Sequence, residues 1–452
     1  MDRVHRILES MDPTIPPSYA STLPAPPPEY STGQRRSMTE HTYTLSSLTS
    51  PPWATLKVFS RSPNASQLPA ILEGDRLVGT VVLDLVQPDS IVAVSVAANG
   101  KVVSTQDPLL TFLDLKTVLW SKERGDPRNP TLPARKLAGH YEWPFSFELP
   151  GSVAVVGYQG TAFRLPQTFL ERRFPTSVQY ALVVNITRST FRVNSRIQTN
   201  FNFVPVTRPP PPSALRQLAY RQGTPLSGPE MDPTGWELLQ PFTIRGTAFN
   251  TRRVEATCQL ALAKPLCYTR GSQIPCVIFL SSADTQALDL LSAPRAITVA
   301  LRRRLRPIQP ASKRSGMFDA SADLSADPAE TIALASWWPA SPAAAHHSSR
   351  RLEGEIPLPV TLKPSARMAH FAVEYSVEVL PFKAVAFTPL PIEPATSSNT
   401  YLRQLVEIVT MFAGGGAPAP RSYAPPQYSA SQEEASESAY FNADGLGHVW
   451  RT

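Results

Sequence analysis

Proline is unevenly distributed along this chain, and its distribution limits where regular structure can form. The 452 residues include 48 prolines, about twice the share found in an average protein. Nine lie in residues 1–52 and nine more in residues 205–241. Because proline lacks a backbone N–H and fixes φ, helix interiors and central strands exclude it. The pattern predicts two folded blocks, residues 51–207 and residues 236–390, which proline-rich segments flank and join.

The segments outside these blocks complete the predicted organisation. We expect residues 1–50 to form a disordered tail and residues 391–452 a second tail. Between the blocks, residues 208–235 are predicted to be a proline-rich linker, with four consecutive prolines at 209–212 as a stiff spacer. An inserted loop, residues 310–350, is predicted inside the second block because it is rich in Ala, Ser, Asp and Pro.

The first block has the sequence pattern of short β-strands. Residues 77–86 are rich in β-branched side chains, and residues 145–150 and 178–184 alternate apolar and polar positions, as strands with one buried face do. Another predicted strand ends at Asn99-Gly100, a pair typical of a hairpin turn. Hydrophobic residues make up 42% of the chain, so there is enough apolar surface for a core. The pattern predicts an all-β sandwich.

The two blocks contain an internal repeat. The apolar sequence that begins at Gly74 recurs 197 residues later at Gly271, and the strand pattern at 178–184 recurs 195 residues later at 373–379. Two such matches in the same order, with nearly equal offsets, favour two copies of one sandwich.

Two other segments have patterns of their own. Residues 401–412 have the spacing of a short amphipathic helix, which the glycines at 414–416 would end. Trp337 and Trp338 lie in the predicted insertion. They are interpreted either as a docking element or as aromatic rings that pack back onto the sandwich.

The net charge of the chain is +7, and both tails carry more acidic than basic residues. The positive charge therefore belongs to the folded blocks, where it allows contact with an anionic membrane surface or with phosphorylated tails. For the run of arginines at 302–304 with Arg306, solvated surface charge is the simpler interpretation. No nucleic-acid partner is expected.

The sequence lacks the common patterns of catalytic and cofactor sites. It contains no phosphate-binding glycine loop, zinc-protease helix or nucleophile elbow. Its three cysteines, Cys258, Cys267 and Cys276, form no CxxC pair and are predicted to be buried thiols. We therefore expect no enzymatic activity, no cofactor and no metal site. The absence of a signal-peptide pattern and of a long apolar run predicts a cytosolic protein.

The most specific pattern is the tetrapeptide Pro-Pro-x-Tyr (PPxY), which occurs three times and only in the predicted tails. Consecutive prolines hold the backbone near polyproline II, so little entropy is lost when the aromatic groove of a WW domain accepts their rings. Several copies add avidity when a partner has more than one WW domain. The predicted WW-binding residues are Pro16, Pro17, Tyr19, Pro27, Pro28, Tyr30, Pro425, Pro426 and Tyr428.

This combination resembles the fungal α-arrestins, the arrestin-related trafficking adaptors. The closest matches to the family's N-terminal domain are EGDRLVG at residues 73–79 and FSFELP at residues 145–150. The resemblance covers about residues 50–390 and is better in the first block than in the second. It implies two tandem immunoglobulin-like β-sandwiches in the arrestin fold.

The resemblance also implies a function. Members of the family are non-enzymatic adaptors that bind membrane transporters or receptors through their arrestin lobes. They recruit a HECT-type ubiquitin ligase through PPxY motifs, so that the cargo is ubiquitinated and endocytosed. The expected location is cytoplasmic, with peripheral association with the plasma membrane and endosomes. Many relatives carry these motifs only after the second lobe, whereas two of the three here precede the first.

Two other functions remain open from the sequence. One is an arrestin-fold scaffold or coat protein, similar to the arrestin-like subunit of retromer, in which the PPxY motifs are incidental. The other is an all-β enzyme, whose unrecognised site would need a deep pocket with convergent polar groups.

Overall fold

The computed structural model describes residues 38–46, 51–105, 109–125, 136–158, 160–172, 174–189, 192–306, 329–340, 347–369, 371–392 and 399–425. These residues belong to one compact unit of the chain. Their secondary structure is mostly β, as the sequence predicts. Neither helix in these residues is long and apolar enough to cross a membrane.

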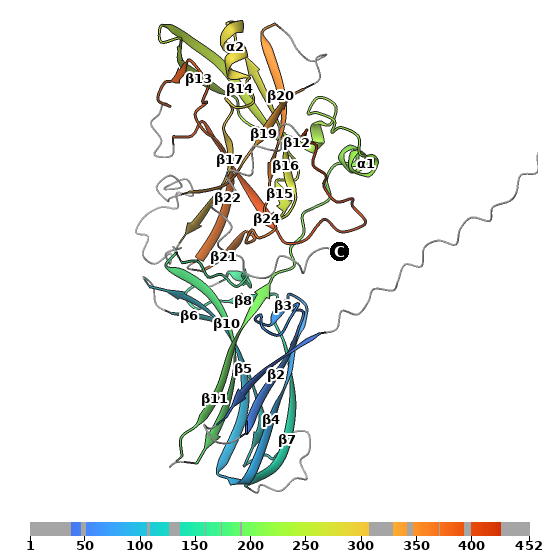
Figure 1. The fold of residues 1–452 in the computed structure, drawn as a ribbon, viewed down its shortest axis with the longest axis vertical. Coiled ribbons are helices and arrows are strands. Elements are labelled where there is room, and N and C mark those ends of the chain that lie inside the picture. The colour runs from blue at the N-terminus through green and yellow to red at the C-terminus, as the bar shows by residue number, and fades with distance from the viewer. Residues whose placement is uncertain are drawn as a thin grey trace, which may run out of the picture. The chain divides into compact units, whose positions relative to one another are not determined.

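The first half of the chain (residues 38–207) contains two curled sheets and a small hairpin (Figure 1). Its strands are β1 (Thr39–Leu45), β2 (Ala54–Ser60), β3 (Ala70–Leu72), β4 (Arg76–Asp89), β5 (Ile91–Ser104), β6 (Leu110–Ser121), β7 (Leu137–Glu148), β8 (Ser152–Ala154), β9 (Ala162–Arg164), β10 (Thr176–Arg188) and β11 (Ser195–Val204). One sheet has the order β1-β2-β4-β7, the other β3-β11-β10-β5-β6, and β8 pairs with β9. Side chains from both sheets meet in one apolar core, where Val81, Val96 and Tyr180 are fully buried.

The second half (residues 208–425) also contains two sheets. Its elements are α1 (Ala214–Gln222), a 3₁₀ turn (Pro233–Gly235), β12 (Trp236–Leu238), β13 (Phe242–Ala248), β14 (Arg252–Ala263), β15 (Cys267–Thr269), β16 (Gln273–Ser281), α2 (Thr285–Leu291), β17 (Val299–Arg306), β18 (Glu330–Leu334), β19 (Ser336–Pro339), β20 (Ser349–Pro357), β21 (Ala366–Met368), β22 (Phe371–Val379), β23 (Phe387–Pro389) and β24 (Leu402–Val409). The sheets have the orders β19-β20-β16-β14-β13-β23 and β15-β24-β22-β17-β18.

The two halves share one order of strands, in agreement with the sequence repeat. The series β3-β11-β10-β5-β6 corresponds to β15-β24-β22-β17-β18, and the short first strand is parallel to its neighbour in both. Gly74 and Gly271, which begin the repeated sequence, both have positive φ, +87° and +78°. Tyr180 and Tyr375 occupy equivalent strands, and each hydroxyl donates to an upstream carbonyl, at 2.8 and 2.7 Å.

The EGDRLVG and FSFELP sequences, at residues 73–79 and 145–150, contact each other in the structure. Gly79 of β4 is paired with Phe145 of β7. A Cβ at Gly79 would lie 2.3 Å from the Lys57 carbonyl oxygen and 2.5 Å from the Phe145 ring, so only glycine fits there without a shift. Upstream of Gly79, the Glu73 carboxylate accepts hydrogen bonds from the Val206 backbone N–H at 2.7 Å and from Arg164 at 2.6 Å. Glu73 thereby holds the end of the first half in place.

The halves contact each other through aromatic and charged side chains. The rings of Phe169 and Phe371 lie 4.9 Å apart between centroids. Glu171 accepts two hydrogen bonds from the Arg303 guanidinium, at 2.7 and 2.8 Å. This bidentate geometry is the strongest form of such a pair, because two parallel N–H bonds fix its orientation.

The helix expected at residues 401–412 is wrong, because residues 402–409 form β24, beyond the predicted end of the second block. Val406 and Ile408 are buried whereas Leu405 and Glu407 are exposed, which is a period of two. The same apolar residues also fit a helical period, so the sequence alone does not distinguish a helix from a strand here. Pairing with β22 on one side and β15 on the other satisfies the backbone groups that a helix would satisfy locally.

Two further segments contain strands where none was expected. Residues 39–45, placed in the disordered tail, form β1, an edge strand whose buried His41 hydrogen-bonds to Ser60 at 2.8 Å. In the expected loop at 310–350, β18 and β19 extend the edges of both sheets of the second half. Edge pairing with an existing strand explains both, since a template of free N–H and C=O groups orders a neighbouring segment.

The hairpin turn expected at Asn99-Gly100 is also wrong. Both residues lie within β5, opposite Ala181 and Tyr180 of β10. A Cβ at Gly100 would lie 2.5 Å from the Phe112 ring. Glycine therefore stands at this position because an aromatic ring packs against the backbone, not because the chain turns.

The contact at Gly79 gives a stability prediction. We expect Gly79→Ala to reduce the free energy of unfolding by about 1–3 kcal/mol, because the new methyl group meets a backbone carbonyl that cannot move independently. Urea unfolding followed by tryptophan fluorescence measures the change. Gly151→Ala is the control, since its nearest neighbour would be 3.8 Å away. Equal urea midpoints for the two variants would show that the close contacts around Gly79 contribute nothing to stability.

Candidate functional site

The structure describes only one of the nine predicted WW-binding residues. Pro425 is half-buried and is the last described residue of the chain. The others lie outside the described residues: Pro16, Pro17, Tyr19, Pro27, Pro28, Tyr30, Pro426 and Tyr428. The segment that leads to Pro425 is therefore the part of the structure closest to a predicted site.

This C-terminal segment (residues 410–425) begins against the linker. The Thr410 hydroxyl donates to the Pro205 carbonyl at 2.7 Å and accepts from the Thr207 N–H at 2.9 Å. Met411 donates its N–H to Thr207, and Arg208 donates to the Phe412 carbonyl at 2.8 Å. The exit from the first half and the exit from β24 are thus hydrogen-bonded together.

The prolines expected to form a spacer have a second role in the structure. Pro209, Pro210 and Pro212 line a small cavity together with Phe412 and Pro418 of the C-terminal segment. The linker also contains α1, which begins after the capping residue Ser213 and ends at Gly223 in the left-handed region. The predicted linker is therefore packed against the second half rather than extended between the halves.

Beyond this cavity, the segment reaches Glu355 on β20. Both carboxylate oxygens of Glu355 accept hydrogen bonds, one from the Ser422 hydroxyl and the other from the Tyr423 N–H at 3.0 Å. The Tyr423 ring stacks on the Tyr220 ring of α1, with 6.3 Å between centroids and an interplanar angle of 19°. Glu355 is 7% exposed, so these hydrogen bonds satisfy a carboxylate that water hardly reaches.

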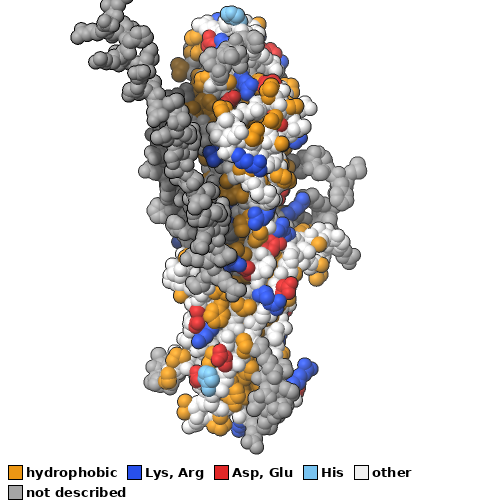
Figure 2. Space-filling model, turned by 90° about the vertical axis from the view of Figure 1, so that its right-hand side faces the viewer, with side chains coloured by type: hydrophobic (Ala, Val, Ile, Leu, Met, Phe, Trp, Pro, Cys, Tyr) orange, Lys and Arg blue, Asp and Glu red, His pale blue; other side chains and the backbone are white. Residues whose placement is uncertain are grey.

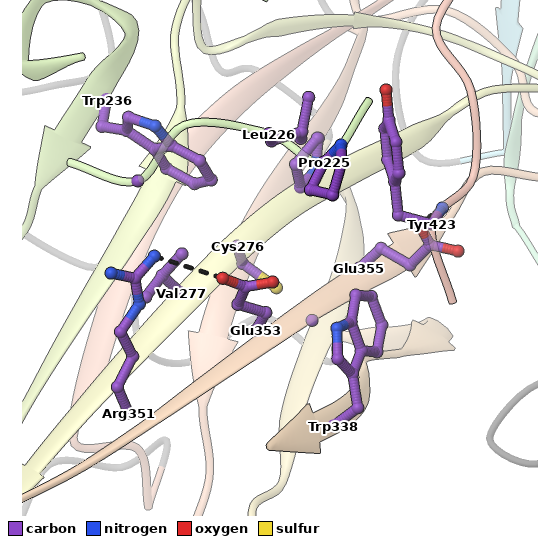
Figure 3. Close-up of a pocket in the computed structure, with 13 residues that line it drawn as sticks. Pro225, Leu226, Trp236, Cys276, Val277, Trp338, Arg351, Glu353, Glu355 and Tyr423 are labelled. Atoms are coloured by element: carbon purple, nitrogen blue, oxygen red, sulfur yellow. Dashed lines mark hydrogen bonds and ion pairs between the residues drawn. The ribbon is translucent and has the colours of Figure 1, made fainter. Parts of the chain in front are cut away.

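A pocket of about 170 Å³ opens beside this contact (Figure 3). In the close-up, Trp338 lies on one side of the space and Tyr423, with Pro225, on the other. Leu226 and Trp236 complete the apolar wall. Aromatic walls with a few polar groups are typical of a binding pocket.

The polar groups of the pocket are largely paired with one another. Arg351 forms an ion pair with Glu353 at 3.2 Å, drawn as a dashed line in Figure 3, and another with Glu230 at 3.1 Å. Cys276 lies in the wall, and burial raises the pKa of its thiol well above the ordinary value. The thiol therefore stays protonated and is a poor nucleophile.

The two tryptophans of the predicted insertion face opposite sides of β19. Trp337 is 2% exposed and packs into the core over Gly354, where a Cβ would lie 2.5 Å from its ring. Trp338 lines the pocket. Because neighbouring strand residues point to opposite faces, one ring packs back onto the second half while the other remains available to a ligand.

The arginine run at 302–306 is not a solvated basic patch. Arg304 is 2% exposed and forms an ion pair with Glu378, which is fully buried. Arg302 contacts the other oxygen of the same carboxylate at 3.1 Å, and Arg403 lies 3.6 Å from the oxygen that Arg304 contacts. Three guanidinium groups therefore surround one buried carboxylate.

The remaining arginines of the run are also paired. Arg306 contacts Glu374 at 3.2 Å, and Arg303 contacts Glu171 as described above. On the uncovered part of the face in Figure 2, basic side chains are interleaved with acidic and apolar ones. The arginines of this run therefore form ion pairs within the second half and, through Arg303, with the first half.

No group of three or more His, Cys, Asp or Glu side chains in the described ranges has the geometry of a metal site. The three cysteines are free thiols, two of them buried, and burial raises the pKa of Cys267 to about 12. Cys258 of β14 and Cys276 of β16 are buried as predicted, whereas Cys267 of β15 is only half-buried.

Sequence reasoning missed the contact of Glu355 with Ser422 and Tyr423. The two sides of this contact are 67 and 68 residues apart, and neither has a motif. The only local signal is Tyr423 itself, an aromatic residue two positions before a PPxY motif.

Sequence comparisons with protein-family models and with curated proteins identify no relative of this chain. No protein-family model matches the chain, and no curated protein is significantly similar to it in sequence. Function must therefore be inferred from the motifs and from the geometry described above.

The buried Glu378 gives a pH prediction. Burial acts to raise its pKa, but hydrogen bonds from Arg304 and Ser376 and the nearby positive charges hold it below the ordinary value of 4.5. A lowered folded-state pKa stabilises the protein above pH 4.5, and this contribution disappears as the pH falls through the folded-state value. We expect Glu378→Gln to cost about 3–5 kcal/mol at neutral pH, because Arg304 is left buried without a charged partner.

Urea unfolding between pH 7 and pH 3 measures this effect. The difference between wild type and Glu378→Gln should shrink as the pH falls below 4.5. Glu148→Gln is the control, because its side chain is 80% exposed and its ion pair should contribute little. An unchanged difference at all pH values would contradict the assigned role of the carboxylate.

Proposed function

We propose that this protein is a non-enzymatic trafficking adaptor of the α-arrestin type. It binds membrane transporters or receptors and recruits a HECT-type ubiquitin ligase through its PPxY motifs, so that the bound cargo is ubiquitinated and endocytosed. It works in the cytoplasm, at the inner face of the plasma membrane and on endosomes.

The observation that carries this proposal is the threefold occurrence of PPxY outside the two pairs of sheets. Each motif presents two prolines and a tyrosine with the spacing that a WW domain recognises. Three motifs allow a ligase with several WW domains to bind with avidity. All three precede β1 or follow β24 in the chain, so no motif residue belongs to a described strand.

The strand order supports the proposed fold. In the proposal, the two halves are immunoglobulin-like sandwiches arranged as in an arrestin. Two curled sheets per half, with the same order of strands in both, support this interpretation. The contact of the EGDRLVG and FSFELP sequences through Gly79 and Phe145 also supports it, because it gives a packing reason for the residues that carry the resemblance.

In the proposal, the protein also contacts an anionic membrane surface when it binds its cargo. The net charge of +7 supports it, because positive charge draws a protein toward anionic lipids. Because the arginines at 302–306 are paired with carboxylates, we expect other basic residues of the surface to contact the anionic lipids.

A triple substitution tests ligase recruitment. We expect Tyr19→Ala, Tyr30→Ala and Tyr428→Ala together to weaken binding to a tandem WW domain by about 100-fold or more, because no motif remains to supply avidity. Calorimetric titration measures the affinity, and circular dichroism checks the fold. Tyr440→Ala is the matched control, since this tyrosine lies in the same tail without a preceding proline pair.

Retained WW binding by the triple variant would refute the proposal. Normal cargo sorting by a variant that has lost WW binding would instead favour a scaffold or coat protein whose PPxY motifs are incidental.

A further inference from the structure

The surface around Glu355 already holds an occupant, which is the chain's own residues 421–425 (the docked segment). Ser422 and Tyr423 occupy both oxygens of the Glu355 carboxylate. Hydrogen bonds to a charged acceptor are about twice as strong as those between neutral groups. The docked segment is therefore held by a specific polar contact, not by chain connectivity alone.

The second wall of this surface is α1. Tyr220 of α1 is 3% exposed, and burial raises the pKa of its hydroxyl to about 12. It stays neutral at physiological pH and presents a flat aromatic face, on which Tyr423 stacks. Arg421 lies beside Gly223, close enough that a Cβ there would be 3.2 Å from its guanidinium. Three consecutive residues of the segment, Arg421 to Tyr423, are thus in contact with α1, its capping glycine or β20.

The position of this contact relative to the third PPxY motif is the important point. Tyr423 lies two residues before Pro425, the first residue of the motif, and Pro425 itself is half-buried. A WW domain must accept the rings of both prolines in its aromatic groove. Ser422 and Tyr423, which lie three and two residues before Pro425, are held on Glu355 and Tyr220, so this contact restricts the approach of a WW domain to Pro425.

We propose that the surface formed by Glu355 and Tyr220 is an intramolecular docking site for residues 421–425, and that docking competes with WW domains for the third PPxY motif. This inference rests on the proposed function, because it assigns a regulation to one of the motifs that recruit the ligase. The motif binds a WW domain only in molecules whose docked segment has been released. The apparent dissociation constant therefore equals the intrinsic constant divided by the released fraction.

The test uses the full chain with Tyr19→Ala and Tyr30→Ala, so that only the third motif remains. The probe is a single WW domain from a HECT-type ligase, and fluorescence anisotropy gives the dissociation constant. A synthetic peptide of residues 419–432, which lacks the docking site, gives the intrinsic affinity. We expect the peptide to bind about tenfold more tightly than the chain, as when about one molecule in ten is released.

Substitutions at the docking site should remove this difference. Glu355→Ala in the same background deletes both acceptors and should raise the affinity to that of the peptide. Ser422→Asp places a second negative charge beside Glu355 and should have the same effect through repulsion. If Glu355→Ala does not fold, the Ser422→Asp variant still tests the proposal. A peptide with Ser422→Asp controls for direct effects on the WW domain. Glu237→Ala is the matched control, since this carboxylate pairs with Lys264 elsewhere on the second half, and it should change nothing.

The outcomes separate this inference from the proposed function. If the peptide binds but the chain, Glu355→Ala and Ser422→Asp all bind with the same affinity as the peptide, the docked segment does not restrict the motif and the inference is wrong. If neither peptide nor chain binds the WW domain, ligase recruitment by this motif fails, and the inference fails with it. A weaker chain that Glu355→Ala and Ser422→Asp both restore to peptide affinity supports both.

Discussion

Burial of one face of every central strand is the constraint on which the rest of this structure depends. Val81 and Tyr180 are fully buried in the first half, and Ile278 and Tyr375 are buried in equivalent strands of the second. Once the sheets of each half close over these side chains, the outer faces and edges remain for other contacts. The linker and the C-terminal segment both lie on such surfaces, and hydrogen bonds between Thr207, which precedes the linker, and Thr410, which begins the C-terminal segment, join the starts of the two segments.

Periodicity was enough to predict the central strands and the repeat, because alternation of side chains follows directly from strand geometry. Periodicity was not enough where a residue's conformation depends on a distant side chain or on a neighbouring strand. Gly100 looks like a turn residue until the Phe112 ring occupies the space of its side chain. Val406 and Ile408 fit a helix as well as a strand until β22 and β15 lie beside them. Long-range pairing cannot be read from a local pattern.

In the candidate site, too, some features follow from the local sequence and others only from the fold. The PPxY motifs are local patterns, so the sequence reveals them completely. The Glu355 contact joins residues from β20 and from the end of the chain, and only the fold brings these together. The arginine run looked like a surface patch, yet the fold places carboxylates such as Glu378 among the arginines. Composition gives the charge of a segment, whereas its partners determine whether the charge is available to a ligand.

The proposed adaptor combines three recognition motifs with a surface that we propose controls one of them. Hydrogen exchange at the Tyr423 amide, in the chain with Tyr19→Ala and Tyr30→Ala, tests this combination most directly. This N–H donates to Glu355, so we expect slowed exchange in the free protein, and exchange about tenfold faster when a WW domain saturates the third motif. Exchange that stays equally slow with the WW domain bound would contradict competition between docking and ligase recruitment.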